Sequence, residues 1–194
     1  MTSPELEWYC FSEEQKNELK KSWSLFESKK TTVAQDIYEM IFNQCPEARK
    51  LFPKLRFHHS RPDRKQNEFT FQAMRFMQVI EGAVLSIDDL TKLDVILENL
   101  GRRHGKLEVN GKFRAYYWST FLECSIYHIR KELTSSKKFN DNDLDRVVIL
   151  WRTLLRDVMK KIKLNDDRRI SLPHIHHKAS VVSEVSSNDF DEVL

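Results

Sequence analysis

The chain has 194 residues, of which 40% are hydrophobic, 31% charged and 11% aromatic, so it is long enough for one domain with a substantial core. Its 32 basic and 29 acidic residues give a net charge of +3, which is too balanced to indicate a nucleic-acid partner. Four glycines and five prolines are few, and this scarcity argues against a turn-rich β fold and favours long helices.

Cysteine usage and the N-terminal residues bear on cellular location. The three cysteines, Cys10, Cys45 and Cys124, lie far apart, which argues against a disulfide framework and favours a reducing compartment. The first residues lack the pattern of a signal peptide, and no apolar run reaches the ~18 residues of a spanning helix. We therefore expect a cytoplasmic protein without a membrane span, with Cys45 and Cys124 as buried thiols.

The first predicted helix begins at a capping box. Ser12 and Gln15 are spaced so that each side chain can satisfy a free backbone N–H at the helix start. Apolar residues then recur on one face of this helix: Leu19, Trp23 and Phe26. A second helix is predicted over about 33–44, and Pro46 stands where a short new turn is expected to begin.

The middle of the chain contains a predicted loop and two further helices. Residues 57–64 combine two histidines, a proline and several charges, which is typical of a loop, and a long helix is predicted over about 67–85. Residues 86–89 carry a helix-start signature before the next apolar stripe. Gly101 and Gly105 are expected to break that stripe, because glycine is a poor helix former.

Two helices and a polar tail complete the predicted architecture. One helix is expected over about 114–133, and Asn140 is expected to cap the last helix. The last helix has an unbroken apolar stripe formed by Val147, Val148, Trp151, Leu154, Leu155, Val158 and Ile162. We predict an all-α protein in three parts: a short N-terminal extension, one helical domain and a flexible tail, over residues 1–10, 11–164 and 165–194 respectively.

The segment that ends at His104 is the first indication of a chemical function. Leu100 and His104 are four residues apart and therefore share one face of a helix, where a histidine can reach a metal in the core. Such a histidine, taken alone, is more often a surface or capping residue. Trp23 lies in the first helix, Phe52 follows Pro46 by six residues, and Trp151 lies in the last helix. Residues 79–104 resemble the corresponding segment of neuroglobin-like chains without a gap. With these features the chain resembles the globins, in particular invertebrate intracellular and neuroglobin-like members, over about residues 11–164.

This resemblance implies the globin fold and one haem b, that is, iron protoporphyrin IX. His104 matches the proximal iron ligand, with its second ring nitrogen donating to a protein acceptor. Leu100 would pack beneath the haem, Phe52 would stack against its distal side, and Phe76 would fill the pocket near the bound gas.

The distal residues implied by the resemblance are Gln72 and Tyr38. Gln72 stands where most globins have histidine, and its amide can donate a hydrogen bond but is not a normal iron ligand. Tyr38 can donate a second hydrogen bond, so the resemblance implies reversible binding of O2 or another diatomic gas, for transport or sensing. The competing interpretation is that Tyr38 is a core aromatic whose hydroxyl is bonded elsewhere.

Three other functions stay open on the sequence alone. The first is a haem that serves as a redox sensor or electron carrier, with His58 or His59 as an internal sixth ligand. An enzyme acting as a nitric oxide dioxygenase or a peroxidase would need a separate reductase, because the chain has no flavin or nicotinamide motif. A haemless helical interaction module is disfavoured by His104 and Phe52. Candidate partners for the haem propionates are Lys54, Arg56, Arg102 and Arg103.

The tail carries a candidate modification site. Arg168 and Arg169 precede Ser171, and Pro173 follows it, a pattern that suits a basophilic kinase and a phosphoserine-reading adaptor. We treat phosphorylation of Ser171 with adaptor binding as a hypothesis, since so short a motif often arises by chance.

Overall fold

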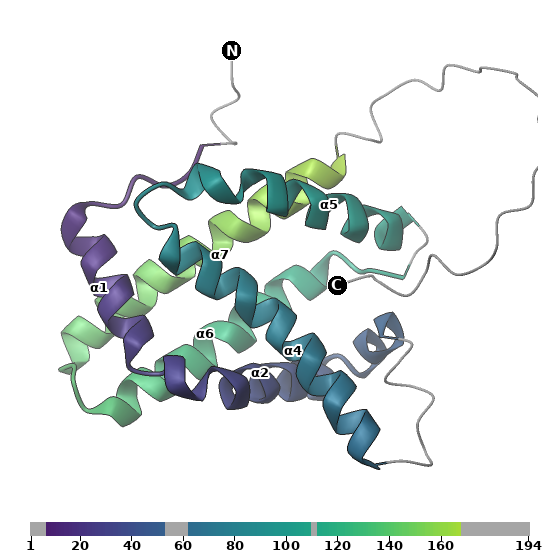
Figure 1. The fold of residues 1–194 in the computed structure, drawn as a ribbon, viewed down its shortest axis with the longest axis horizontal. Coiled ribbons are helices and arrows are strands. Elements are labelled where there is room, and N and C mark those ends of the chain that lie inside the picture. Colours follow the sequence, from purple (N-terminus) through teal and green to yellow (C-terminus); the bar gives the residue numbers. More distant parts are fainter. Residues whose placement is uncertain (1–6, 53–61, 110–111, 168–194) are drawn as a thin grey trace, which may run out of the picture.

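Helices make up nearly all of the chain that the computed structural model describes, namely residues 7–52, 62–109 and 112–167 (Figure 1). The prediction of an all-α fold is confirmed, and no strand occurs within these three ranges. The elements, with η denoting 3-10 helices, are α1 (Glu13–Ser24), η2 (Glu27–Lys29), α2 (Lys30–Gln44), η3 (Pro46–Leu51), α4 (Pro62–Leu85), η4 (Leu90–Leu93), α5 (Asp94–Val109), α6 (Tyr116–Ser136) and α7 (Asp141–Asp167).

The core is centred on Trp151, which α7 carries at 0% exposure. Its ring centroid lies 6.4 Å from that of Trp23 and 5.8 Å from that of Phe26. Its Nε1 donates a 2.9 Å hydrogen bond to the hydroxyl of Ser22, which is also fully buried. These contacts join the N-terminal helices to α7 across most of the chain length. The predicted apolar face of the last helix is confirmed, and that of the first is confirmed at Leu19 and Trp23, whereas Phe26 is buried but follows the end of α1 at Ser24.

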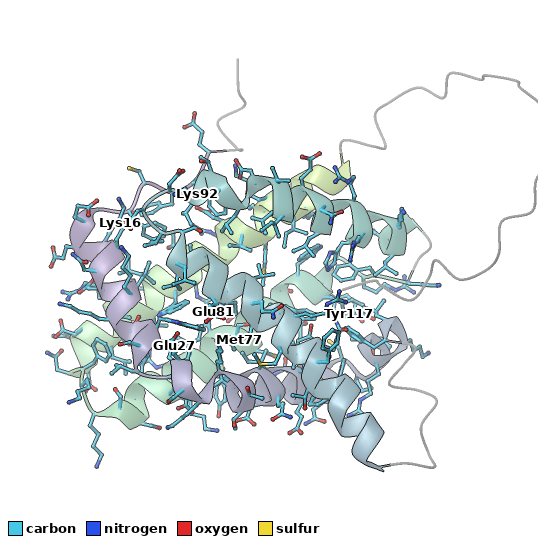
Figure 2. All side chains as sticks on the ribbon, in the orientation of Figure 1. Lys16, Glu27, Met77, Glu81, Lys92 and Tyr117 are labelled. Carbon is cyan, nitrogen blue, oxygen red and sulfur yellow. The ribbon has the colours of Figure 1, made fainter. Side chains whose placement is uncertain are left out.

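Packing between α2, α4, α5 and α7 shapes the interior. In Figure 1, α5 lies beside α7 along the upper side of the molecule, and α4 crosses obliquely to reach α2. Met77 of α4 is 1% exposed and fills the space between helices (Figure 2). One turn later, Glu81 accepts a 2.6 Å hydrogen bond from Lys30 and so ties α4 to the start of α2.

Two of the three predicted helix caps are present, whereas no side chain caps η4 at Asp89. The Ser12 hydroxyl accepts from the backbone N–H of Gln15, and the Gln15 side chain accepts from the backbone N–H of Ser12. The side chain of Asn140 accepts a 2.9 Å hydrogen bond from the backbone N–H of Asp143, so that α7 begins at Asp141. The starts of α1 and α7 therefore lie where the capping residues predict them.

Two predictions of local structure are wrong. Part of the predicted 57–64 loop is helical, because α4 begins at Pro62, and proline is well suited to a first helical position. Gly101 and Gly105 do not break the helix, since α5 continues to Val109. Both glycines are buried, and the packing of α5 on α7 offsets the roughly 1 kcal/mol that each costs relative to alanine.

Three further expectations concern the cysteines, a membrane span and the tail. Cys45 and Cys124 are buried free thiols and Cys10 is exposed. No helix among the described residues is both long and apolar enough to cross a membrane. The Ser171 motif falls in 168–194 and thus lies outside the described residues.

Candidate functional site

A cavity of about 370 Å³ lies between α4, α5 and α7 and is closed by α2, η3 and α6. Its volume falls in the range of small-molecule and cofactor pockets, and its walls are mostly aliphatic and aromatic. All six residues singled out by sequence line this one cavity: Tyr38, Phe52, Gln72, Phe76, Leu100 and His104. The structure thus brings together side chains from α2, α4 and α5 and from Phe52, which directly follows η3.

His104 is held in one tautomer by its own helix. Its Nδ1 lies 2.8 Å from the carbonyl oxygen of Leu100, one turn earlier on α5. A carbonyl can only accept, so Nδ1 carries the proton and the Nε2 lone pair is available to a metal. Burial lowers the pKa of His104 below its usual 6.5, although the hydrogen bond to Leu100 opposes this shift. The imidazole is therefore neutral near pH 7, which is the form that ligates iron.

Two aromatic rings fix the orientation of the His104 ring. Phe113 meets it edge-on with ring centroids 5.5 Å apart, and Trp118 of α6 lies at 5.2 Å. Both residues line the cavity. Sequence reasoning missed them, because neither carries a motif and their contact with His104 arises only when the segment after α5 and the start of α6 fold back beside it.

Tyr38 dominates the wall formed by α2 and α4. Its side chain is 2% exposed, and its ring meets five phenylalanines at centroid distances from 5.6 to 6.4 Å: Phe42, Phe52, Phe69, Phe76 and Phe121. Burial raises the pKa of the Tyr38 hydroxyl far above its usual 10, and a side-chain hydrogen bond with Gln72 partly opposes this rise. Tyr38 therefore keeps its proton at any physiological pH and can act as a donor.

Few charged groups reach the cavity. Arg103 lines it, as does Arg75, whose guanidinium lies 5.3 Å from the ring centroid of Phe71 and which sequence reasoning missed. Arg102 instead pairs with Glu98 at 2.8 Å and does not line the cavity. The remaining candidates for propionate or iron contacts fall in 53–61, outside the described residues: Lys54, Arg56, His58 and His59.

Comparison with protein families matches this architecture. The family model described as Globin covers residues 35–160, from within α2 to within α7. The match extends over more than half of the chain, and the chain belongs to the globin family.

Individual relatives are distant. The chain is 30% identical over 119 residues to neuroglobin from Dissostichus mawsoni, a match that covers 59% of this chain and 75% of that protein. It is 28% identical over 96 residues to Globin-1 from Mordacia mordax, and this match covers 49% of the chain but only 64% of that protein, less than two thirds. A crystal structure described as a hexacoordinated heme protein from an anhydrobiotic tardigrade superimposes with a TM-score of 0.65 at 21% identity, over 86% of this chain and 99% of that one. At this identity the likeness shows the fold alone.

Family membership implies a haem cofactor, and the cavity residues fit one. A buried neutral imidazole presents a free lone pair, as iron requires. The walls are apolar and aromatic, as a porphyrin requires, and Arg103 is a cation at the lining that can meet a propionate. We find no residue in the described lining that conflicts with a haem.

Proposed function

We propose that this globin holds haem b and binds O2 or another diatomic gas reversibly. The observation that carries the proposal is one cavity lined by a neutral buried His104 and by the hydrogen-bonded pair Tyr38 and Gln72. Bound haem supplies a ferrous iron that takes up a diatomic gas. The protein residues then determine how the haem is held and how the gas is stabilised.

On the α5 side, His104 would ligate the iron through Nε2. The Leu100 carbonyl accepts from Nδ1, which orients the ring and increases the basicity of the ligating nitrogen. Phe113 and Trp118 restrict rotation of the imidazole. Leu100 would pack against one side of the haem and Phe52 and Phe76 against the other, and these apolar side chains would keep water from the iron.

On the α2–α4 side, Tyr38 and Gln72 act as a coupled donor pair. Gln72 and the Tyr38 hydroxyl share a hydrogen bond. With the Gln72 amide as its donor, the Tyr38 hydroxyl proton is left for a gas ligand that has gained negative charge. A donor held in an apolar cavity before the gas arrives needs little reorganisation. This pair favours O2, which becomes strongly polarised, over less polar diatomic gases.

An internally ligated haem with a redox or sensor role is the second candidate. It is favoured by the likeness of the fold to a protein described as hexacoordinated, and His58 and His59 are the residues that would supply the sixth ligand. Gln72 and Tyr38 are poor ligands for ferrous iron, so this alternative depends on the segment 53–61. The buried free thiols Cys45 and Cys124 support a reducing compartment, and we propose a cytoplasmic location.

The decisive test is the visible absorbance spectrum of the haem-loaded, dithionite-reduced chain kept free of gas. A single broad visible band indicates five-coordinate ferrous iron and supports an open gas-binding site. Sharp split bands would show an internal sixth ligand, and the redox or sensor function would then replace gas binding. The variant His104→Ala is expected to lose stable haem, whereas His128→Gln, which changes a buried histidine outside the cavity lining, is the matched control and should keep the parent spectrum.

A further inference from the structure

A second, smaller hollow lies between α6 and α7 on the far side of Trp118 from His104. Its volume is about 180 Å³, and it has an apolar floor and a basic rim. Trp118, Leu122 and Met159 form the floor, and Trp118 and Met159 also line the large cavity. The two cavities therefore share a wall, but the haem function proposed above uses none of the rim residues.

Three cations of α7 surround this hollow. Arg156, Lys160 and Lys163 are spaced by four and three residues, so they lie on one face of the helix, and all three are exposed. None of them forms an ion pair among the side chains that the structure describes. Like charges at this spacing destabilise a helix slightly, and an anion bound among them would relieve that repulsion.

The neighbouring helix does not neutralise this rim. Glu123, which follows Leu122 on α6, is engaged by both guanidinium nitrogens of Arg152. That pairing draws the acidic group one turn along α7, away from Arg156. Ser119, the polar residue of α6 at the hollow, donates its hydroxyl to the backbone carbonyl of Tyr116. The hollow thus combines apolar packing surface with a cationic rim that lacks a counter-charge within the described residues.

We propose that this hollow binds a small amphiphilic anion, namely a short aliphatic chain that ends in a carboxylate or phosphate. A volume of 180 Å³ equals the space of about six water molecules in the liquid, which fits a chain of medium length. The aliphatic chain of the ligand packs on Trp118, Leu122 and Met159, and its anionic head group lies at the rim. Apolar burial supplies part of the affinity, and the three cations select the anion.

Occupancy of the hollow is sensed at the large cavity through Trp118. The Trp118 ring is centred 5.2 Å from the His104 ring, so a displacement of the indole reaches the imidazole directly. The indole N–H of Trp118 is buried and has no hydrogen-bond partner among the described residues. Its NMR resonance is therefore a local probe of this wall.

The first experiment is calorimetric titration of the full haem-loaded chain with octanoate, octyl phosphate and 1-octanol. We expect both anions to bind and the neutral alcohol to bind about tenfold more weakly or not at all, with the ratio of the two anion affinities identifying the preferred head group. The triple variant Arg156→Gln, Lys160→Gln and Lys163→Gln should lower octanoate affinity about tenfold, and added salt should weaken binding to the parent chain. The matched control changes three exposed lysines elsewhere, Lys21→Gln, Lys106→Gln and Lys138→Gln, and should alter affinity less than about twofold.

The second experiment localises the ligand. In the carbon monoxide form, the Trp118 indole N–H resonance, assigned with Trp118→Phe, should shift on addition of octanoate. Trp23 also has a buried N–H without a partner in the described residues, and it lies outside both cavities, so its resonance should stay fixed. Equal binding of octanol, equal binding by the triple variant, or binding only to chain freed of haem would each overturn the proposal. None of these results would alter the absorbance test of gas binding.

Discussion

Replacing Tyr38 with phenylalanine removes one hydroxyl from the α2–α4 wall and leaves the aromatic packing in place. The ring of Tyr38 is centred 5.8 Å from Phe52 and 5.9 Å from Phe76, and a phenylalanine ring can keep both contacts. The substitution also removes the hydroxyl to which Gln72 is hydrogen-bonded. Tyr38→Phe is therefore a selective test of the proposed donor.

The size of the effect follows from the hydrogen bond that is lost. A bond to a group carrying negative charge contributes about 1.5–3 kcal/mol, which corresponds to roughly a 10- to 100-fold faster dissociation of O2. Carbon monoxide acquires little negative charge, so its dissociation rate should change much less. If Tyr38 and Gln72 act as a coupled pair, the effects of Tyr38→Phe and Gln72→Leu will not add in the double variant.

The assay is stopped-flow measurement of O2 dissociation from the haem-loaded ferrous chain, with carbon monoxide measured in parallel. Tyr117→Phe is the matched control, because Tyr117 is also 2% exposed but does not line the cavity. An O2 dissociation rate for Tyr38→Phe within twofold of the parent would refute the proposed role. Tyr38 would then be a core aromatic whose hydroxyl serves only Gln72.

Three further predictions concern stability and are measured by urea unfolding. Ser22→Ala leaves the buried indole N–H of Trp151 without its acceptor and should cost about 1–3 kcal/mol, whereas the exposed Ser24→Ala should cost almost nothing. Ser12→Ala removes the capping box of α1 and should cost about 1 kcal/mol, and an unchanged midpoint would show that the cap is dispensable. Burial lowers the pKa of His128 below 6.5 despite the nearby carboxylate of Asp36. As the pH falls, the imidazole therefore takes up its proton at a higher pH in the unfolded chain than in the folded chain. The free energy of unfolding should therefore fall as the pH drops through 6.5, by at most about 1.4 kcal/mol per pH unit from this group. His128→Gln should reduce this dependence on pH. An unchanged dependence would show that the imidazole is already charged in the folded state.

Local sequence determined the helices and the faces that they bury. Trp151 and its neighbours on α7 repeat at helical spacing, and that period identifies the buried side without knowledge of any partner. The capping box of Ser12 and Gln15 and the hydrogen bond between the His104 ring and the Leu100 carbonyl are likewise contacts within about one helical turn. Interactions over three or four residues depend on backbone geometry alone, so the sequence is enough to predict them.

Resemblance to a family, rather than local chemistry, brought Tyr38 and Gln72 into the predicted site. Nothing in the spacing of these two residues shows that they meet at one cavity with His104. The family pattern carried that information because it reflects a known arrangement of helices. The roles of these residues stay predictions until the spectra and rates are measured.

Tertiary packing decided what local propensity could not. Gly101 and Gly105 lie within a continuous α5, because packing on α7 outweighs the intrinsic cost of glycine in a helix. Phe113 and Trp118 meet His104 only because the segment after α5 and the first turn of α6 fold back beside it, and Trp118 lines both the large cavity and the basic hollow. A sequence period states which side of a helix is apolar, but it does not state which other helix covers that side. The partner depends on how distant segments fit together in three dimensions.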